Sequence, residues 1–260
     1  MNKHELRTIR LLEMLQTRKR LDVQTVAKSL GISEATVRRF FSQLEEQGKV
    51  IRVHGGVRLA PQLGYDYSFR VSAAHRQREK ALIAGRAAEL VQNGERIFLD
   101  SGTTVLRLAE ALALRLQTGT LKALVALTNS MTHLETLARW CKVILIGGEI
   151  RVERLDVCGS LAETNLMMFH VNKAFLGADA VNLKSGFMTT DERTSKMNQI
   201  VVERADHVYV LVDSGKFDKS SFVQYASLDQ ADAIYTDGGI GQDTLRQYIQ
   251  AGARIEIVRE

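Results

Sequence analysis

Between residues 96 and 258 the sequence alternates short, almost continuously apolar runs with longer stretches of helical periodicity. Strands buried on both faces read as continuous apolar runs, and a helix between strands is the usual connection in a parallel sheet. We therefore expect a mainly parallel sheet covered by helices on both faces, which is an α/β fold. The expected strands are 96–100, 123–128, 142–146, 173–178, 207–213, 233–236 and 254–258, and the expected helices are 104–117, 131–140, 161–169, 191–205 and 242–250.

The first sixty residues carry the net charge of the chain. They hold twelve Lys and Arg against six acidic residues, a net charge of +6, whereas the whole chain of 260 residues carries +5. A basic segment on a nearly neutral body is typical of a polyanion-binding module joined to a domain with another task. The only proline, Pro61, follows this segment and indicates a linker, because proline is excluded from helix interiors and central strands. We expect a first domain at 1–58, a linker at 59–72 and a second domain at 73–260.

Three helical patterns and a hairpin signal fill the basic segment. Apolar residues recur with helical spacing over 6–15 and again over 23–30, where Gly31 closes the second helix. Ser33 is the expected N-cap of a third helix that runs to Gln47. Two short β-rich runs at 49–59 flank a Gly-Gly pair, which predicts a hairpin. Three helices followed by a hairpin form a winged helix-turn-helix, which binds double-stranded DNA.

The third helix is the one that enters the major groove in such a fold. Its outward face and the hairpin carry side chains that can bind base edges or phosphates. Phe40 stands beside the inward-facing Phe41, and the sequence leaves open whether it packs in the core or touches DNA, with packing favoured. The expected DNA-binding residues are Ser33, Glu34, Thr36, Arg38, Arg39, Ser42 and Gln43 in the helix, with Arg52 and His54 in the hairpin.

In the second domain, polar and glycine residues follow several of the expected strands. Ser101, Gly102, Thr103 and Thr104 lie where a strand ends and a helix begins, a position that suits a phosphate group. A plain Ser/Thr-rich helix cap is the alternative. The remaining candidates are Asn129 and Ser130, Gly147 and Gly148, Asp179, Lys216, and Glu192, which is spaced for an ordinary ion pair with Lys196.

At these motifs the sequence resembles the DeoR family of bacterial transcriptional regulators. The resemblance lies in SEATVRRFFSQLEEQGKVIRVHGGV (33–57), REKALIA around Lys80, DSGTT (100–104), the Gly-Gly pair at 147–148, GAD (177–179), Glu192 with Lys196, and DSGKF (213–217). Phe40 departs from the family, whose members commonly carry Asp at this point.

The resemblance implies a repressor of a sugar or carbohydrate catabolism operon that acts as a homo-oligomer, a dimer or tetramer, on a DNA operator. The family's second domain is similar to ribose-phosphate isomerase and CoA-transferase folds and typically binds a phosphorylated sugar. We expect the effector phosphate on residues 101–104 with Lys216, and the sugar hydroxyls on Asp100, Asp179 and Glu192.

Other functional classes fit the sequence less well. No apolar run is long enough to span a bilayer and charged residues interrupt the first sixteen, so we expect a cytoplasmic protein. Cys141 and Cys158 are not spaced for zinc, and we expect no metal, no cofactor and no catalytic residue. The alternative is a sugar-phosphate isomerase or transferase with a DNA-binding appendage, for which Asp179, Glu192 and Lys184 supply acid and base groups. Leu176 and Ala180 stand where the related isomerases are acidic, which argues against it.

Overall fold

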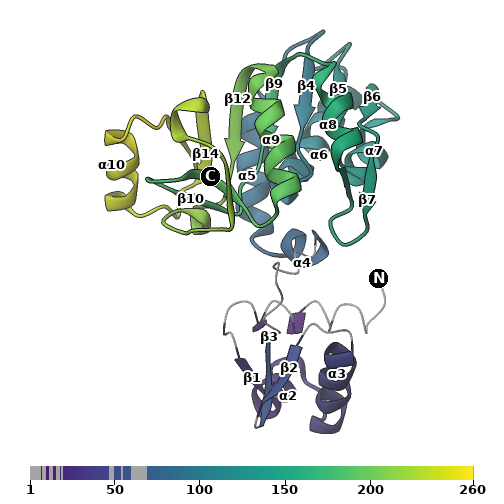
Figure 1. Cartoon of the computed structure of the whole chain (residues 1–260), viewed down its shortest axis with the longest axis vertical. Coiled ribbons are helices and arrows are strands. Elements are labelled where there is room, and N and C mark those ends of the chain that lie inside the picture. The colour runs from purple at the N-terminus through teal and green to yellow at the C-terminus, as the bar shows by residue number, and fades with distance from the viewer. Residues whose placement is uncertain are drawn as a thin grey trace. The chain divides into compact units, whose positions relative to one another are not determined.

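A computed structural model describes residues 7, 10–11, 14–15, 18, 20–46, 50–53, 55–59 and 69–259. The chain divides into two compact units, Met1–His75 and Arg76–Glu260 (Figure 1). Most of the linker expected at 59–72 lies outside the described residues. We call the first unit the head and the second the sensor unit, and describe each by itself.

The head contains a helix-turn-helix followed by a β-hairpin. The side chain of Asp22 accepts a hydrogen bond from the amide of Thr25 and caps the second helix, which ends at Gly31 in the left-handed conformation (φ 62°), as predicted. Three antiparallel strands in the order β1-β3-β2 complete the unit. The described residues 7, 10–11, 14–15 and 18 are helical, and the other elements are β1 (Arg20–Asp22), α2 (Val23–Leu30), α3 (Glu34–Glu46), β2 (Val50–Val53) and β3 (Gly56–Leu59).

The core of the head forms on the predicted face of α3. Val37, Phe41 and Leu44 are buried there, and Leu15 of the first helix joins them. Phe40 is 4% exposed and belongs to the same cluster, so it packs in the core. The residues expected inward at 6, 9 and 12 lie outside the described residues.

The sensor unit is built on a seven-stranded sheet in the order β15-β14-β12-β9-β4-β5-β6, and every pair of neighbours is parallel. The carboxyl ends of all seven strands therefore lie at one edge of the sheet. The strands are β4 (Arg96–Leu99), β5 (Val125–Thr128), β6 (Lys142–Leu145), β9 (Val171–Leu176), β12 (Ala205–Leu211), β14 (Ala233–Asp237) and β15 (Ile255–Val258). The helices are α5 (Gln77–Ala88), α6 (Thr103–Gln117), α7 (Met131–Leu137), α8 (Ser160–Met167), α9 (Glu192–Glu203) and α10 (Gln242–Gln250). Helix α4 (Phe69–Ala74) precedes them in the chain and belongs to the first unit.

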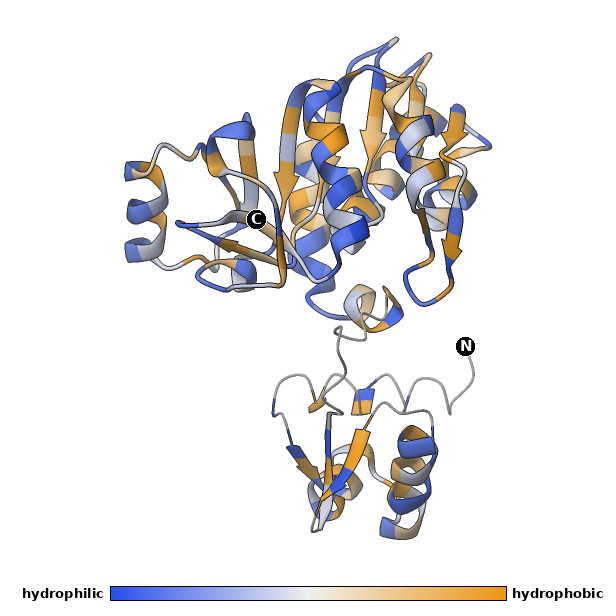
Figure 2. Cartoon of the chain, in the orientation of Figure 1, coloured by the Kyte–Doolittle hydropathy of each residue, from blue (hydrophilic) through white to orange (hydrophobic). Residues whose placement is uncertain are grey.

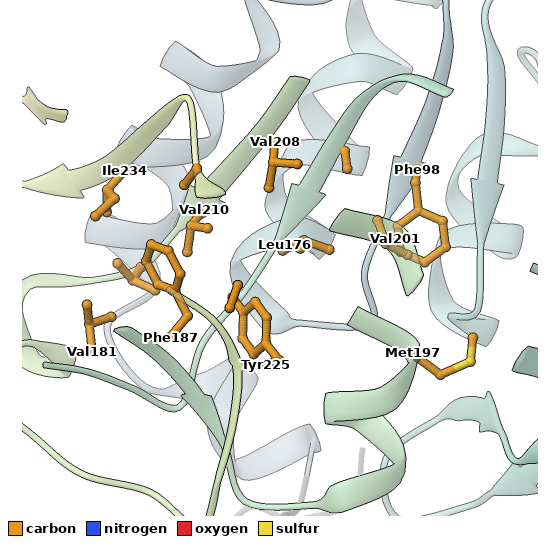
Figure 3. Close-up of a cluster of buried hydrophobic side chains, with 14 of the residues drawn as sticks. Phe98, Leu176, Val181, Phe187, Met197, Val201, Val208, Val210, Tyr225 and Ile234 are labelled. Atoms are coloured by element: carbon orange, nitrogen blue, oxygen red, sulfur yellow. The ribbon is translucent and has the colours of Figure 1, made fainter. Parts of the chain in front are cut away.

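Helices cover both faces of the sheet, and the strands are largely apolar (Figure 2). In β4, Phe98 points into the core under α8 and α9, whereas Ile97 and Leu99 point into the core under α5 and α6. Figure 3 shows the first of these cores. The parallel α/β class and the seven expected strands are confirmed.

The sequence patterns missed three parts of the sensor unit. Helix α5 turns a face rich in small residues, such as Ala84 and Ala87, to the core, which weakens its apolar pattern. A two-stranded hairpin and a small antiparallel sheet, in the order β10-β11-β13, were also missed. The missed elements are β7 (Glu149–Arg151), β8 (Asp156–Cys158), β10 (Ala180–Asn182), β11 (Gly186–Thr189) and β13 (Val223–Ala226), and the 3-10 turns Ser214–Lys216 and Leu228–Gln230.

Candidate functional site

The amino-terminal turn of α3 presents the predicted reading surface. The Ser33 hydroxyl accepts a hydrogen bond from the amide of Thr36 at 3.3 Å, which confirms Ser33 as the N-cap. Glu34, Arg38 and Arg39 are exposed, and an ion pair of 3.7 Å joins Glu34 to Arg38 one turn later. Two arginines on an exposed helix face at this position suit the floor of a major groove.

Two other predicted DNA-binding residues contact each other instead. Arg52 of β2 donates a hydrogen bond to the Ser42 hydroxyl at 2.6 Å, and both are only partly exposed. Gln43 is half-buried on the same helix. His54 lies outside the described residues.

At the carboxyl edge of the sensor sheet, the Asp100 carboxylate joins the loops that follow β4 and β9. It accepts hydrogen bonds from the amides of Ser101 at 2.7 Å and Gly177 at 3.0 Å. Gly102 and Gly177 are in close approach, and a Cβ on Gly102 would lie 3.7 Å from the Gly177 Cα. Burial raises the pKa of Asp100 to about 6, and the charges of Asp156 and Asp179 act in the same direction.

Ser101 is held by an ion-pair network that sequence reasoning did not find. Its hydroxyl donates a hydrogen bond to Asp156 at 3.0 Å, and Arg151 binds both carboxylate oxygens of Asp156 at 2.8 and 2.7 Å. Arg151 also pairs with Asp191, the N-cap of α9, and with the hydroxyl of Thr194. The network ties the β7–β8 hairpin, α9 and the loop after β4 together.

Asn129 and Ser130 are also buried between the sheet and this hairpin. The Asn129 carbonyl accepts the amide of Val157 at 2.8 Å, and the Ser130 amide donates to the Thr128 hydroxyl at 3.0 Å. The side-chain oxygen of Asn129 is buried without a hydrogen-bond partner. Asn129 holds the hairpin to the sheet through Val157, and Ser130 does so through an isolated antiparallel bridge to Asp156.

The two glycines predicted at 147 and 148 differ in their surroundings. A Cβ on Gly148 would lie 2.7 Å from the carbonyl oxygen of Cys158 and 2.8 Å from the Cβ of Ala162. Gly147 is exposed, and a Cβ there would meet only Asn165, at 3.8 Å. Gly148 is therefore required for packing, which is sufficient reason for its presence.

At the start of α6, backbone amides and two threonine hydroxyls are available to bind a ligand. Gly102 supplies the N-cap and offers no side-chain oxygen to the first amides of the helix. Within the described chain, the hydroxyls of Thr103 and Thr104 make no hydrogen bond. Free amides at a helix start favour an anion, because they point outward and carry partial positive charge.

Cationic side chains of three elements interact electrostatically with one another, and one of them, Arg107, lies in the second turn of α6, where it also pairs with Glu110 at 2.8 Å. Lys80 of α5 is 4% exposed, and the charges of Lys216, Arg107 and Asp213 all act on it. Arg107 lies one turn after Thr103 on the same side of α6. Burial, with a contribution from the two neighbouring cations, lowers the pKa of Lys80 to about 8.

The prediction of site residues included Lys216 but missed Lys80. The only signal for Lys80 was its place in the REKALIA motif. Arg76, also missed, pairs with Asp213 at 3.3 Å and donates a hydrogen bond to Ser214 at 3.0 Å, which fixes the loop after β12 beside the start of α5.

A second polar group lies around Asp179. Its carboxylate accepts hydrogen bonds from the Thr189 hydroxyl and from the amide and hydroxyl of Thr190, all through one oxygen, at 2.9 to 3.2 Å. Burial raises the pKa of the Tyr225 hydroxyl well above its usual value, and the charges of Asp100 and Asp179 act in the same direction. Glu192 and Lys196 on α9 are both exposed, and no ion pair joins them in the described structure.

Two further observations concern the described residues as a whole. No helix among them is both long enough and apolar enough for a membrane crossing. No cluster of three His, Cys, Asp or Glu side chains among them is placed to hold a metal ion.

Comparison with known proteins identifies both units. Residues 75–238 match the family described as "DeoR C terminal sensor domain", and residues 7–62 match the "DeoR-like helix-turn-helix domain". The HTH-type transcriptional regulator GlpR of Haloferax volcanii is 30% identical over 95% of this chain and 94% of its own. A putative aga operon transcriptional repressor of Escherichia coli O157:H7 is 30% identical over 96% and 92%. The glycerol-3-phosphate regulon repressor of Escherichia coli K12 is 27% identical over 87% and 88%.

Two solved structures are similar to part of the chain. A D-ribose-5-phosphate isomerase in complex with phospho-erythronic acid is 19% identical over 54% of each chain, with a TM-score of 0.41. The eIF2B beta subunit of Chaetomium thermophilum is 18% identical over 61% of this chain and 48% of its own, with a TM-score of 0.45.

The three relatives named above are transcriptional regulators by name, and none is an enzyme. With matches to both of its domains and relatives along nearly its whole length, the chain belongs to the DeoR family of transcriptional regulators.

Proposed function

We propose that this regulator represses a sugar or carbohydrate catabolism operon and releases its DNA when a phosphorylated sugar binds to the sensor unit. The observation that carries the proposal is the uncapped start of α6, which carries the unpartnered hydroxyls of Thr103 and Thr104, together with the electrostatic interaction of the buried Lys80 with Lys216 and Arg107. Cations and free amides at the carboxyl edge of a parallel sheet form a site for a phosphate dianion. The names of relatives, among them a glycerol-3-phosphate regulon repressor, point to the same ligand class.

The phosphate end of the effector is assigned to Thr103, Thr104, Lys80 and Lys216. The two hydroxyls have no partner in the described chain, and the helix amides beside them add directed donors. Gly102 allows the ligand to approach the backbone closely. Ser101 is left out of this assignment, because its amide already donates to Asp100 and its hydroxyl to Asp156.

The sugar end is assigned to Asp179, with Asp100 and Glu192 as further candidates. Asp179 is half-buried and uses one carboxylate oxygen for Thr189 and Thr190, which leaves the other for a ligand hydroxyl. Asp100 is buried with both oxygens engaged, so its contact with a ligand needs a rearrangement of the loop.

The DNA-binding function is assigned to the head. Its net charge of +6 attracts the phosphate backbone, and Arg38 and Arg39 on α3 carry the chemistry of base reading. A homo-oligomer, a dimer or tetramer, brings two heads to the two halves of an operator. Release of DNA by about 100-fold requires about 2.7 kcal/mol of coupling between effector and operator binding.

The test joins both activities in one assay. Fluorescence anisotropy of labelled promoter fragments from the source genome is measured with and without each member of a panel of sugar phosphates, beside the same sugars without phosphate. We expect tight binding to a particular fragment, and release by a phosphorylated sugar but not by its unphosphorylated form. Binding to no fragment at low salt, or equal release by the unphosphorylated sugar, would overturn the proposal.

A variant pair locates the effector site. Lys216→Met is expected to lose effector-induced release while it keeps its affinity for the operator, because Lys216 lies in the sensor unit. Lys122→Met is the control, since Lys122 is exposed and precedes β5 at the opposite edge of the sheet. Equal loss in both variants would contradict the assignment.

A further inference from the structure

The strand register of the wing directs Arg52 toward the recognition helix. Side chains alternate along a strand, so Arg52 lies on the same face as Val50, which is 3% exposed in the head core. Its partner across the hairpin is Val57, which is fully buried. Arg58 pairs with Ile51 on the other face and is exposed. The two arginines of the wing therefore point in opposite directions.

Arg52 makes three polar contacts with α3. Its Nη2 donates to the Ser42 hydroxyl at 2.6 Å and to the Arg38 carbonyl oxygen at 3.2 Å, and its Nε donates to Glu45 at 3.1 Å. Its guanidinium carbon lies 6.0 Å from the centre of the Phe41 ring. The polar contacts fall at positions 38, 42 and 45, a spacing that follows one face of the helix.

These contacts bind one side chain of the hairpin to two turns of α3. A planar guanidinium with fixed donors suits such a role, because it holds several acceptors in one geometry. The side chain also covers the edge of the head core with its stem, as long basic side chains do. These contacts use the donors of Nε and Nη2, so a phosphate could be bound only through Nη1.

We infer that Arg52 is a positioning residue that sets the angle between the wing and the recognition helix, and that it does not itself bind DNA. The inference rests on the proposed DNA-binding function of the head. By fixing the β2–β3 hairpin relative to α3, Arg52 allows Arg38 on α3 and Arg58 on the hairpin to contact one DNA site at the same time. Arg58, exposed and without a partner in the described chain, makes the phosphate contact of the hairpin.

Salt dependence separates the two roles. Each phosphate contact releases counterions when it forms. Its loss therefore makes the fall of the log association constant with log salt concentration less steep, by about 0.9 per head. A positioning residue changes affinity without changing the number of phosphate contacts. We expect Arg52→Met to weaken operator binding by roughly tenfold at every salt concentration with an unchanged slope, and Arg58→Met to weaken binding with a slope reduced by about 1 per head.

The experiment uses the full chain and titrates the operator fragment at four salt concentrations. Thermal unfolding of each variant shows whether the head is folded at the assay temperature. If Arg52→Met is unfolded, Ser42→Ala supplies the same test, because it removes only one acceptor of Arg52. A double-mutant cycle between positions 52 and 42 is expected to be non-additive.

Each result decides one point. A reduced slope for Arg52→Met or for Ser42→Ala, or strict additivity of the pair, would overturn the positioning role. If wild-type protein binds no operator, the proposed function fails first. If wild type binds and Arg52→Met binds equally well, only the inference about Arg52 fails.

Discussion

Arg151 and Asp156 face each other across the β7–β8 hairpin, joined by two hydrogen bonds of 2.8 and 2.7 Å, with exposed side-chain fractions of only 8% and 1%. A buried charge of this kind persists because its partner is present. The Ser101 hydroxyl adds a third bond to Asp156, so the hairpin and the loop at the start of α6 are held by one carboxylate.

Arg151→Met is expected to lower the free energy of unfolding by about 3 to 5 kcal/mol, because it leaves Asp156 buried and unpaired. Arg193→Met is the matched control: its partner Glu149 is 64% exposed, and the loss should stay below about 1 kcal/mol. Urea denaturation of the three proteins measures both changes. Similar small losses in the two variants would show that the buried pair contributes little.

Gly148→Ala is expected to destabilise the sensor unit by about 1 to 3 kcal/mol, because its Cβ would meet the backbone at Cys158 and the side chain of Ala162. Gly147→Ala has open space and should change stability by less than about 0.5 kcal/mol. Thermal denaturation of both variants tests the difference. If the two variants melt together, the packing role of Gly148 is wrong.

Asp100 predicts a dependence of stability on pH. Its pKa rises from 3.8 to about 6 on folding, so the folded protein holds the proton more tightly and ionisation opposes folding. Stability should therefore fall as the pH rises through this range and level off above it. Relative to Asp100→Asn, which does not titrate, wild type should lose up to about 3 kcal/mol between pH 4 and 7. Urea denaturation across this range is the measurement, and a constant difference would contradict the raised pKa.

The layout of the sensor sheet could be predicted because buried parallel strands need continuous apolar runs. The strand over Arg96–Leu99 and the polar residues after it, for example, are adjacent in the sequence. The shared carboxyl edge then followed from the parallel arrangement alone. Ser33 and Gly31 were also identified correctly, since helix caps are local signals.

The partners of the site residues could not be predicted in the same way. Lys80 comes within electrostatic range of Lys216, and Ser101 binds Asp156, only after distant strands have paired. The spacing of these residues in the sequence does not predict these contacts. The inward direction of Arg52 could have been predicted from the sequence, because side chains two residues apart on a strand share a face and Val50 is buried.

Lys80 should make effector binding dependent on pH. Its pKa of about 8 means that it loses its positive charge as the pH rises through that value, so affinity for a phosphate dianion should fall between pH 7.5 and 9.5. Lys80→Met should bind more weakly at pH 7.5, by roughly tenfold or more, and should show a flatter profile. Isothermal titration of the effector identified in the release assay measures both. A profile as steep as that of wild type would exclude Lys80 from the phosphate site.

Arg38→Ala should lower specific operator affinity by about 1 to 3 kcal/mol per head and relax preference at one base pair of each half-site, because a bidentate arginine contact discriminates between bases. The Arg38 side chain is 61% exposed and its ion pair with Glu34 is long, at 3.7 Å, so little internal structure is lost with it. Anisotropy titrations against the operator and its single-base variants give both quantities, with Lys122→Ala as the control in the sensor unit. A uniform loss on all sequences would show that Arg38 binds phosphate instead, and unchanged affinity would remove it from the reading surface.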